Sequence, residues 1–184
     1  MTGKDAEWGP AIMVLSTVVR PMTVDELTAY GLQRMDDEEI ETYLAVHSLG
    51  VLALPTEGAP YLIPMSYGYD GGSGLYFSFV VGERSRKAEL SESAESVSFL
   101  VYNAETMFHW QSVVLVGSIR ALPDEEWDDL TESQAPKWRP ELMETASESE
   151  TVRLFELQIE ERSGIKHTIR PPSFWQRSSR DQPR

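Results

Sequence analysis

Residues 60–90 read PYLIPMSYGYDGGSGLYFSFVVGERSRKAEL, and this stretch decides the fold of the chain. Residues 60–69 and 75–81 are rich in β-branched and aromatic side chains that alternate loosely with polar ones, a pattern that predicts two strands. The glycine-rich segment 70–74 between them can adopt the positive φ angles of a hairpin turn. The sequence therefore predicts an antiparallel hairpin whose second strand ends at Gly82.

A short cationic segment follows this predicted hairpin. It consists of Arg84, Ser85, Arg86 and Lys87, in a chain with 30 acidic and only 16 basic residues. Such groups at a strand-to-helix junction can bind a phosphate, because charge-assisted hydrogen bonds combine there with the free N–H groups of a helix start. The alternative is a solvated helix on which the bases pair with Glu83, Glu89 and Glu92. The residues alone leave both interpretations open.

Periodicity and turn residues extend the prediction along the chain. Upstream we expect a helix over residues 36–48 and a strand over 51–54. Downstream we expect a helix over 86–93, strands over 96–102, 110–122 and 151–160, a loop over 103–109, and helices over 123–133 and 140–146. Residues 164–168 should extend or re-enter the sheet, and Gly117 indicates a bulge or a close backbone approach. Several short strands with peripheral helices favour a mainly β fold, a small antiparallel barrel.

Composition divides the chain into three parts. Residues 1–34 are expected to form an N-terminal extension, with a second possible start at Met22 that leaves the origin of residues 1–21 open. Residues 35–168 hold the predicted barrel. Residues 169–184 are rich in Arg, Pro and Ser, and we expect this tail to be disordered or to lie across an acidic partner subunit.

Composition also excludes several kinds of site and partner. The absence of cysteine excludes disulfides, thiolate metal sites and cysteine nucleophiles. His47, His109 and His167 are isolated in the sequence, so no metal site is predicted. A net charge of −14 argues against nucleic-acid binding, which needs a basic face. No apolar stretch is long enough to cross a membrane and no secretory signal is recognisable, so we expect a cytoplasmic protein.

Four short segments carry a family resemblance. They are YLIPM at 61–65, LYFSF at 75–79, SRKA at 85–88 and WQSVVLVG at 110–117. In order and spacing, over roughly residues 36–168, the chain resembles the pyridoxamine 5'-phosphate oxidase-like family, and SRKA after a Tyr-Phe-Ser strand is the most specific match. The resemblance implies an antiparallel split β-barrel that binds FMN and works as a homodimer.

The resemblance also implies roles for individual residues. Arg86 and Lys87 would hold the FMN phosphate, with Arg84 and Ser85 assisting. The other implied contacts to the flavin are Pro64, Met65, Ser66, Phe77 and Ser78, and, across a dimer interface, Trp110, Gln111 and Ser112. For Met65, Phe77 and Trp110 the alternative is plain barrel core. No catalytic side chain is assigned, because a flavin carries its own redox chemistry.

The substrate stays open at this stage. True pyridoxamine 5'-phosphate oxidases carry a C-terminal Arg-x-His-type segment, and this chain reads SGIKHTIRPPSFWQ there instead. We therefore hypothesise an FMN-dependent oxidoreductase that acts on an unidentified small molecule. The alternatives are an oxidoreductase that uses the deazaflavin F420 on the same fold, and a flavin- or haem-binding protein without turnover.

The excess of carboxylates indicates adaptation to salt, because concentrated salt screens the self-repulsion of an acidic chain. The resemblance points in particular to family members from salt-loving archaea. The alternative is an ordinary acidic cytosolic protein.

We predict that KCl in the molar range raises the melting temperature, because screening relieves repulsion among the surplus carboxylates. Thermal unfolding followed by circular dichroism in dilute buffer and in molar KCl measures the effect. A melting temperature that stays constant or falls would remove the argument for salt adaptation.

Overall fold

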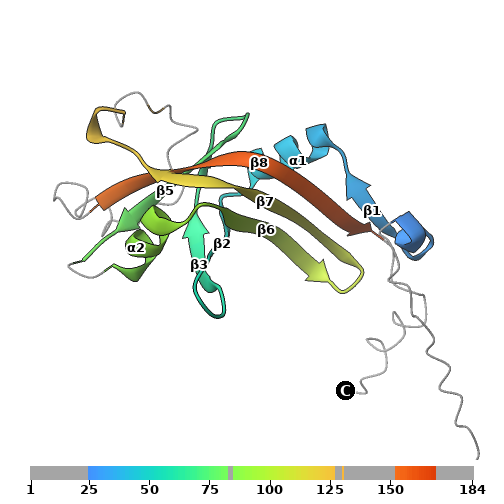
Figure 1. Cartoon of the computed structure of the whole chain (residues 1–184). Coiled ribbons are helices and arrows are strands. Elements are labelled where there is room, and N and C mark those ends of the chain that lie inside the picture. Colours follow the sequence, from blue (N-terminus) through green and yellow to red (C-terminus); the bar gives the residue numbers. More distant parts are fainter. Residues whose placement is uncertain (1–24, 83–84, 127–129, 131–151, 169–184) are drawn as a thin grey trace, which may run out of the picture.

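An eight-stranded antiparallel sheet with two α-helices makes up the described part of the chain, residues 25–82, 85–126, 130 and 152–168 of a computed structural model (Figure 1). The strands are β1 (Leu32–Met35), β2 (Leu49–Leu54), β3 (Tyr61–Ser66), β4 (Gly68–Tyr69), β5 (Gly74–Val80), β6 (Val97–Thr106), β7 (His109–Ala121) and β8 (Val152–Thr168). The helices are α1 (Asp37–Val46) and α2 (Arg86–Ser93), and two 3₁₀ turns are η1 (Asp25–Tyr30) and η2 (Asp124–Glu126).

The order of the strands shows that the barrel is not closed. The sheet runs β3-β2-β6-β7-β8-β5-β4, and β1 adds to β8. β3 and β4 are consecutive in the chain but stand at opposite ends of this order, so the sheet curls back on itself without pairing β3 to β5. This is the antiparallel split β-barrel that the sequence predicted.

Aromatic and aliphatic side chains from all the long strands fill the interior. Among the fully buried ones are Leu52, Leu54, Leu75, Phe77, Phe79, Phe99, Val101, Leu115, Phe155 and Leu157. The rings of Phe79 and Phe155 stack with their centroids 4.4 Å apart, which couples β5 to β8 inside the barrel. Because alternate residues of a strand point to opposite faces, the same strands also present an outward face.

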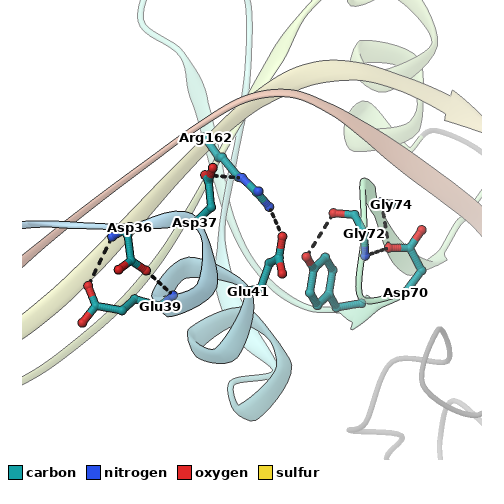
Figure 2. A network of polar contacts seen from close by, with 9 residues as sticks. Asp36, Asp37, Glu39, Glu41, Asp70, Gly72, Gly74 and Arg162 are labelled. Atoms are coloured by element: carbon teal, nitrogen blue, oxygen red, sulfur yellow. Dashed lines mark hydrogen bonds and ion pairs between the residues drawn. The ribbon is translucent and has the colours of Figure 1, made fainter.

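α1 is attached to β8 by charged side chains (Figure 2). The helix begins with a reciprocal capping box between Asp36 and Glu39. Arg162 of β8 donates hydrogen bonds to Asp37 at 3.0 Å and to Glu41 at 2.9 Å. These contacts hold α1 against one face of β8, between α2 on one side and β1 on the other in the view of Figure 1.

Gly117 lies at a bulge, as predicted. The register of β7 on β8 shifts between Val116 and Gly117. A Cβ atom added at Gly117 would lie only 1.9 Å from the backbone oxygen of Gln158, so the two backbones approach too closely for any side chain.

Two strand predictions were wrong. Residues 60–69 are not one strand: β3 pairs with β2, and only β4 pairs with β5. The chain turns at Tyr67, whose buried hydroxyl donates to the Leu44 carbonyl at 3.0 Å and whose N–H donates to the Ser48 carbonyl at 2.9 Å. The predicted loop 103–109 is instead the end of a hairpin, because β6 runs on to Thr106 and β7 starts at His109.

Other elements differ in extent. β8 joins the predicted strand 151–160 to residues 164–168 without a break, and β1 spans the predicted boundary between residues 34 and 35. Of the helix predicted over 123–133, residues 124–126 form η2. Residues 127–129 and 131–151, which include the helix predicted over 140–146, lie outside the described residues. None of the helices that the structure describes is long and apolar enough to span a membrane.

We predict that Gly117→Ala destabilises the protein by about 3 kcal/mol, because overpacking in the middle of a sheet forces the backbone apart. Chemical denaturation monitors the loss. Gly58→Ala is the matched control, since a Cβ there meets no atom within 4 Å. Equal stability of the two variants would show that the β7–β8 contact can relax without cost.

Candidate functional site

The opening of the barrel lies between β3 and β5. β3 carries Pro64, Met65 and Ser66, and β5 carries Phe77 and Ser78. Among the described strands, β3 pairs along one edge only, and β4 covers the second edge of β5 only as far as Tyr76. Unpaired strand edges present backbone N–H and C=O groups, which a ligand with polar edges can bind.

The first turn of α2 lies beside this opening, next to β5 and β3 in Figure 1. Ser85 is the N-cap residue and makes no side-chain capping bond. The guanidinium carbon of Arg86 lies 4.9 Å from the ring centroid of Tyr61 on β3. The Lys87 ammonium lies 5.1 Å from the ring centroid of Phe79 on β5. The two cations therefore stand over the two strands that flank the opening.

The two cations differ from the other basic side chains of the described residues in their partners. Within the described residues, neither Arg86 nor Lys87 forms an ion pair with a carboxylate, whereas Glu92 of α2 pairs with Arg153 of β8. Burial lowers the pKa of the Lys87 ammonium, which means that the charged form is poorly solvated. A half-buried ammonium without a carboxylate partner is a place where an anion is stabilised. Arg84 and Glu83 lie outside the described residues.

The side chains of Met65 and Phe77 belong to the core. Phe77 has no exposed surface and Met65 is 8% exposed. Pro64 is exposed on the outer face of β3, while Ser66 and Ser78 are partly buried. A ligand in the opening would therefore meet Met65 and Phe77 through their backbone.

The three predicted residues of β7 lie apart from the others within one chain. β2 and β6 separate β7 from β3, which places the two strands roughly 14 Å apart. Trp110 stacks almost parallel on His167, with ring centroids 6.0 Å apart. The backbone oxygen of Gln111 accepts a hydrogen bond from the Tyr43 hydroxyl at 3.3 Å. Ser112 pairs with Tyr102 of β6.

A cleft of about 650 Å³ borders β3 on the outer face of the sheet. Its lining comes from the end of α1, from β2 and β3, and from β6, and consists of Val46, His47, Ser48, Leu49, Gly50, Val51, Pro64, Tyr102, Asn103 and Ala104. Sequence reasoning missed this cleft, because residues 103–109 were predicted to be a loop. Among the described residues, no group of three or more His, Cys, Asp or Glu side chains is placed to hold a metal ion.

Comparison with known proteins agrees with this arrangement of strands. The family model for pyridoxamine 5'-phosphate oxidase matches residues 36–166, which is most of the chain. The chain belongs to this family. No curated protein sequence matches it significantly.

Solved structures share the fold at low sequence identity. An FAD-binding protein from Mesorhizobium loti superposes with a TM-score of 0.59 and 23% identity, covering 75% of this chain and 98% of that one. A candidate pyridoxamine 5'-phosphate oxidase from Corynebacterium glutamicum superposes with a TM-score of 0.58 and 15% identity, covering 77% of this chain and 97% of that one. An FAD- and haem-binding protein from Mycobacterium smegmatis superposes with a TM-score of 0.54 and 17% identity, covering 77% of this chain and 75% of that one.

Proposed function

We propose that the protein is a cytoplasmic FMN-binding oxidoreductase that acts on a small molecule. The observation that carries this proposal is the pair of cations at the start of α2, which lie over Tyr61 and Phe79 without an ion-pair partner among the described residues. Flavin binding by similar structures, such as the Mesorhizobium loti protein, supports the same class of ligand.

The spacing along β3 suits a flavin mononucleotide. Pro64 at the cleft lies three positions along β3 from Tyr61, which is under the Arg86 guanidinium, and this is about 10 Å of strand. Because the spacing is odd, Tyr61 packs on the core side of β3 and Pro64 lies on its outer face, so a ligand that reaches both passes over the free edge of the strand. A ribityl chain can bridge such a distance, with the phosphate at the start of α2 and the ring beside β3. The backbone at the free edge of β3 would hold the ribityl chain and the polar edge of the ring.

The flavin, when bound, supplies the transfer of electrons, and the chain supplies binding and orientation. Arg86 and Lys87 neutralise the phosphate, and the rings of Tyr61 and Phe79 hold these cations in place. The apolar lining of the cleft, which includes Leu49 and Pro64, excludes water from the ring.

Two alternatives keep the fold but change the cofactor or the role: an oxidoreductase that uses F420, and a flavin- or haem-binding protein without turnover. The flavin- or haem-binding alternative is supported by the similar Mycobacterium smegmatis structure of a protein that binds both FAD and haem. The visible spectrum of freshly purified protein, followed by mass analysis of the released cofactor, separates the candidates. A haem or F420 spectrum without flavin would overturn the FMN proposal.

We predict that Lys87→Ala and Arg86→Ala each weaken FMN binding by roughly tenfold to a hundredfold, because each removes a charged hydrogen bond to phosphate. Riboflavin, which lacks the phosphate, should bind these variants almost as tightly as it binds the wild type. Flavin fluorescence titration measures both ligands.

Arg120→Ala is the control, because Arg120 carries the same charge but is paired with Glu156 and Glu126. If the Lys87 and Arg86 variants bind FMN as tightly as the Arg120 variant does, the cationic segment is a solvated helix start and the FMN proposal loses its main support.

We also propose that the protein is a homodimer joined through the outer face of β2, β3, β6 and β7. Where these strands pair over residues 49–53, 62–66, 98–102 and 112–116, the outward residues carry no charge: Leu49, Val51, Ala53, Leu62, Pro64, Ser66, Ser98, Leu100, Tyr102, Ser112, Val114 and Val116. Leu49, Leu62 and Tyr102 are 62%, 59% and 57% exposed. A continuous uncharged face on so acidic a chain is a surface that a second copy can cover, and a two-fold axis would bring the partner's β7 towards β3.

We predict that light scattering in molar KCl gives twice the chain mass of 20.8 kDa, and that Val114→Glu shifts the protein to the monomer, because it buries a carboxylate in the interface. Val80→Glu is the matched control: Val80 is 39% exposed, Val114 is 40% exposed, and Val80 lies on β5 outside this face. A monomeric wild type, or dimers of both variants, would contradict this interface.

A further inference from the structure

His47 ends α1 with one ring nitrogen fixed and the other available. Its Nδ1 atom lies 2.8 Å from the backbone oxygen of Tyr43, and its ring packs on the Tyr43 ring with centroids 4.0 Å apart. A carbonyl oxygen can only accept, so Nδ1 carries the proton and donates it. In the neutral imidazole this leaves Nε2 as a hydrogen-bond acceptor. No described residue forms a hydrogen bond with Nε2.

The cleft beside His47 suits a flat, uncharged ligand. Its volume of about 650 Å³ falls within the range of small-molecule sites. Val46, Leu49, Pro64 and Tyr102 give it an apolar lining, and none of its lining side chains is an acid, a lysine or an arginine. A neighbouring hollow of about 400 Å³ shares Val46 and His47 but is lined with acids of α1 and with Lys166, so it differs in chemistry.

We propose that this cleft takes the isoalloxazine ring and that His47 Nε2 accepts the hydrogen bond of the ring's imide N3–H. The inference rests on the proposed flavin function and adds a residue to that site. The oxidised ring is flat and neutral and has a single N–H group, which needs an acceptor when it is removed from water. His47 is among the residues that line the cleft, and the hydrogen bond from Nδ1 to the Tyr43 carbonyl leaves its Nε2 as an acceptor.

Pro64 links the two halves of the site. It lines the cleft on the outer face of β3, three positions along the strand from Tyr61, which packs on the core side beneath Arg86, so the ligand would cross the free edge of β3. The phosphate at α2 and the imide edge at His47 thus mark the two ends of one ligand. His47 would act as a specificity residue, because its Nε2 can accept a hydrogen bond from a ring that has an N–H donor and cannot form this bond with a ring that lacks one.

A double-mutant cycle with riboflavin and 3-methylriboflavin tests this contact. Both probes lack the phosphate, so their binding does not depend on Arg86 or Lys87. His47→Leu should weaken riboflavin by about fivefold to tenfold, the effect of one lost hydrogen bond. Methylation of N3 should weaken binding to the wild type by a comparable factor and should have less effect on the Leu variant. His47→Gln, whose side-chain oxygen can accept, should recover part of the affinity for riboflavin only.

Fluorescence titration gives the affinities, and His109→Leu is the control, because His109 is exposed and pairs with Glu105 at 3.1 Å away from the cleft. Equal effects of N3 methylation on the wild type and on the Leu variant would overturn the role of His47 while leaving flavin binding intact. If the Leu variant does not fold, His47→Ala, which also lacks an acceptor, takes its place in the same comparison. A wild type that binds neither FMN nor riboflavin would overturn the proposed function itself, and this inference with it.

Discussion

The ladder between β7 and β8 is the constraint on which the rest of the structure depends. It runs from the pair His109 and Thr168 to the pair Ala121 and Phe155. The bulge at Gly117 shifts the register within this ladder. The N-terminal half of β8 then pairs with β5, and the C-terminal half presents Arg162 to α1 and pairs with β1. Because β8 holds β5 on one side and β7 holds β6 and β2 on the other, β3 and β5 are left facing each other without being joined.

This open seam is where a strongly acidic chain presents two neighbouring cations, Arg86 and Lys87, which make up the proposed anion site. A closed barrel would have paired both strand edges and covered the start of α2. Here the first turn of α2 brings Arg86 and Lys87 to aromatic rings of β3 and β5. Within the part of the chain that the structure describes, these cations contact aromatic rings and not carboxylates, although the sequence contains 30 acidic residues.

Local signals were sufficient for much of the fold. Side-chain alternation predicts the strand β5, and the segment after Gly82 predicts the start of the helix α2. A glycine inside a strand predicts the bulge at Gly117. Pairing partners were harder, because they depend on distant contacts such as the Tyr67 hydroxyl on the Leu44 carbonyl. The polar end of β6 pairs with β7 through backbone hydrogen bonds, and side-chain patterns do not predict such pairing.

The same distinction applies to the site. Its cationic residues are adjacent in the sequence and could be recognised there, whereas Tyr61 and Phe79 reach these cations only through the curl of the sheet. The cleft that His47 lines likewise depends on how α1 ends against β2, β3 and β6. Among the described strands, β8 is the last to be synthesised, and this affects β5, with which it pairs. Val80 pairs with Val152, so the edge of β5 stays open on the ribosome until the C-terminal part emerges. An open strand edge is a template for aggregation. Acidic residues outnumber basic ones in the segments that emerge before β8, and the resulting repulsion between neighbouring chains opposes such aggregation.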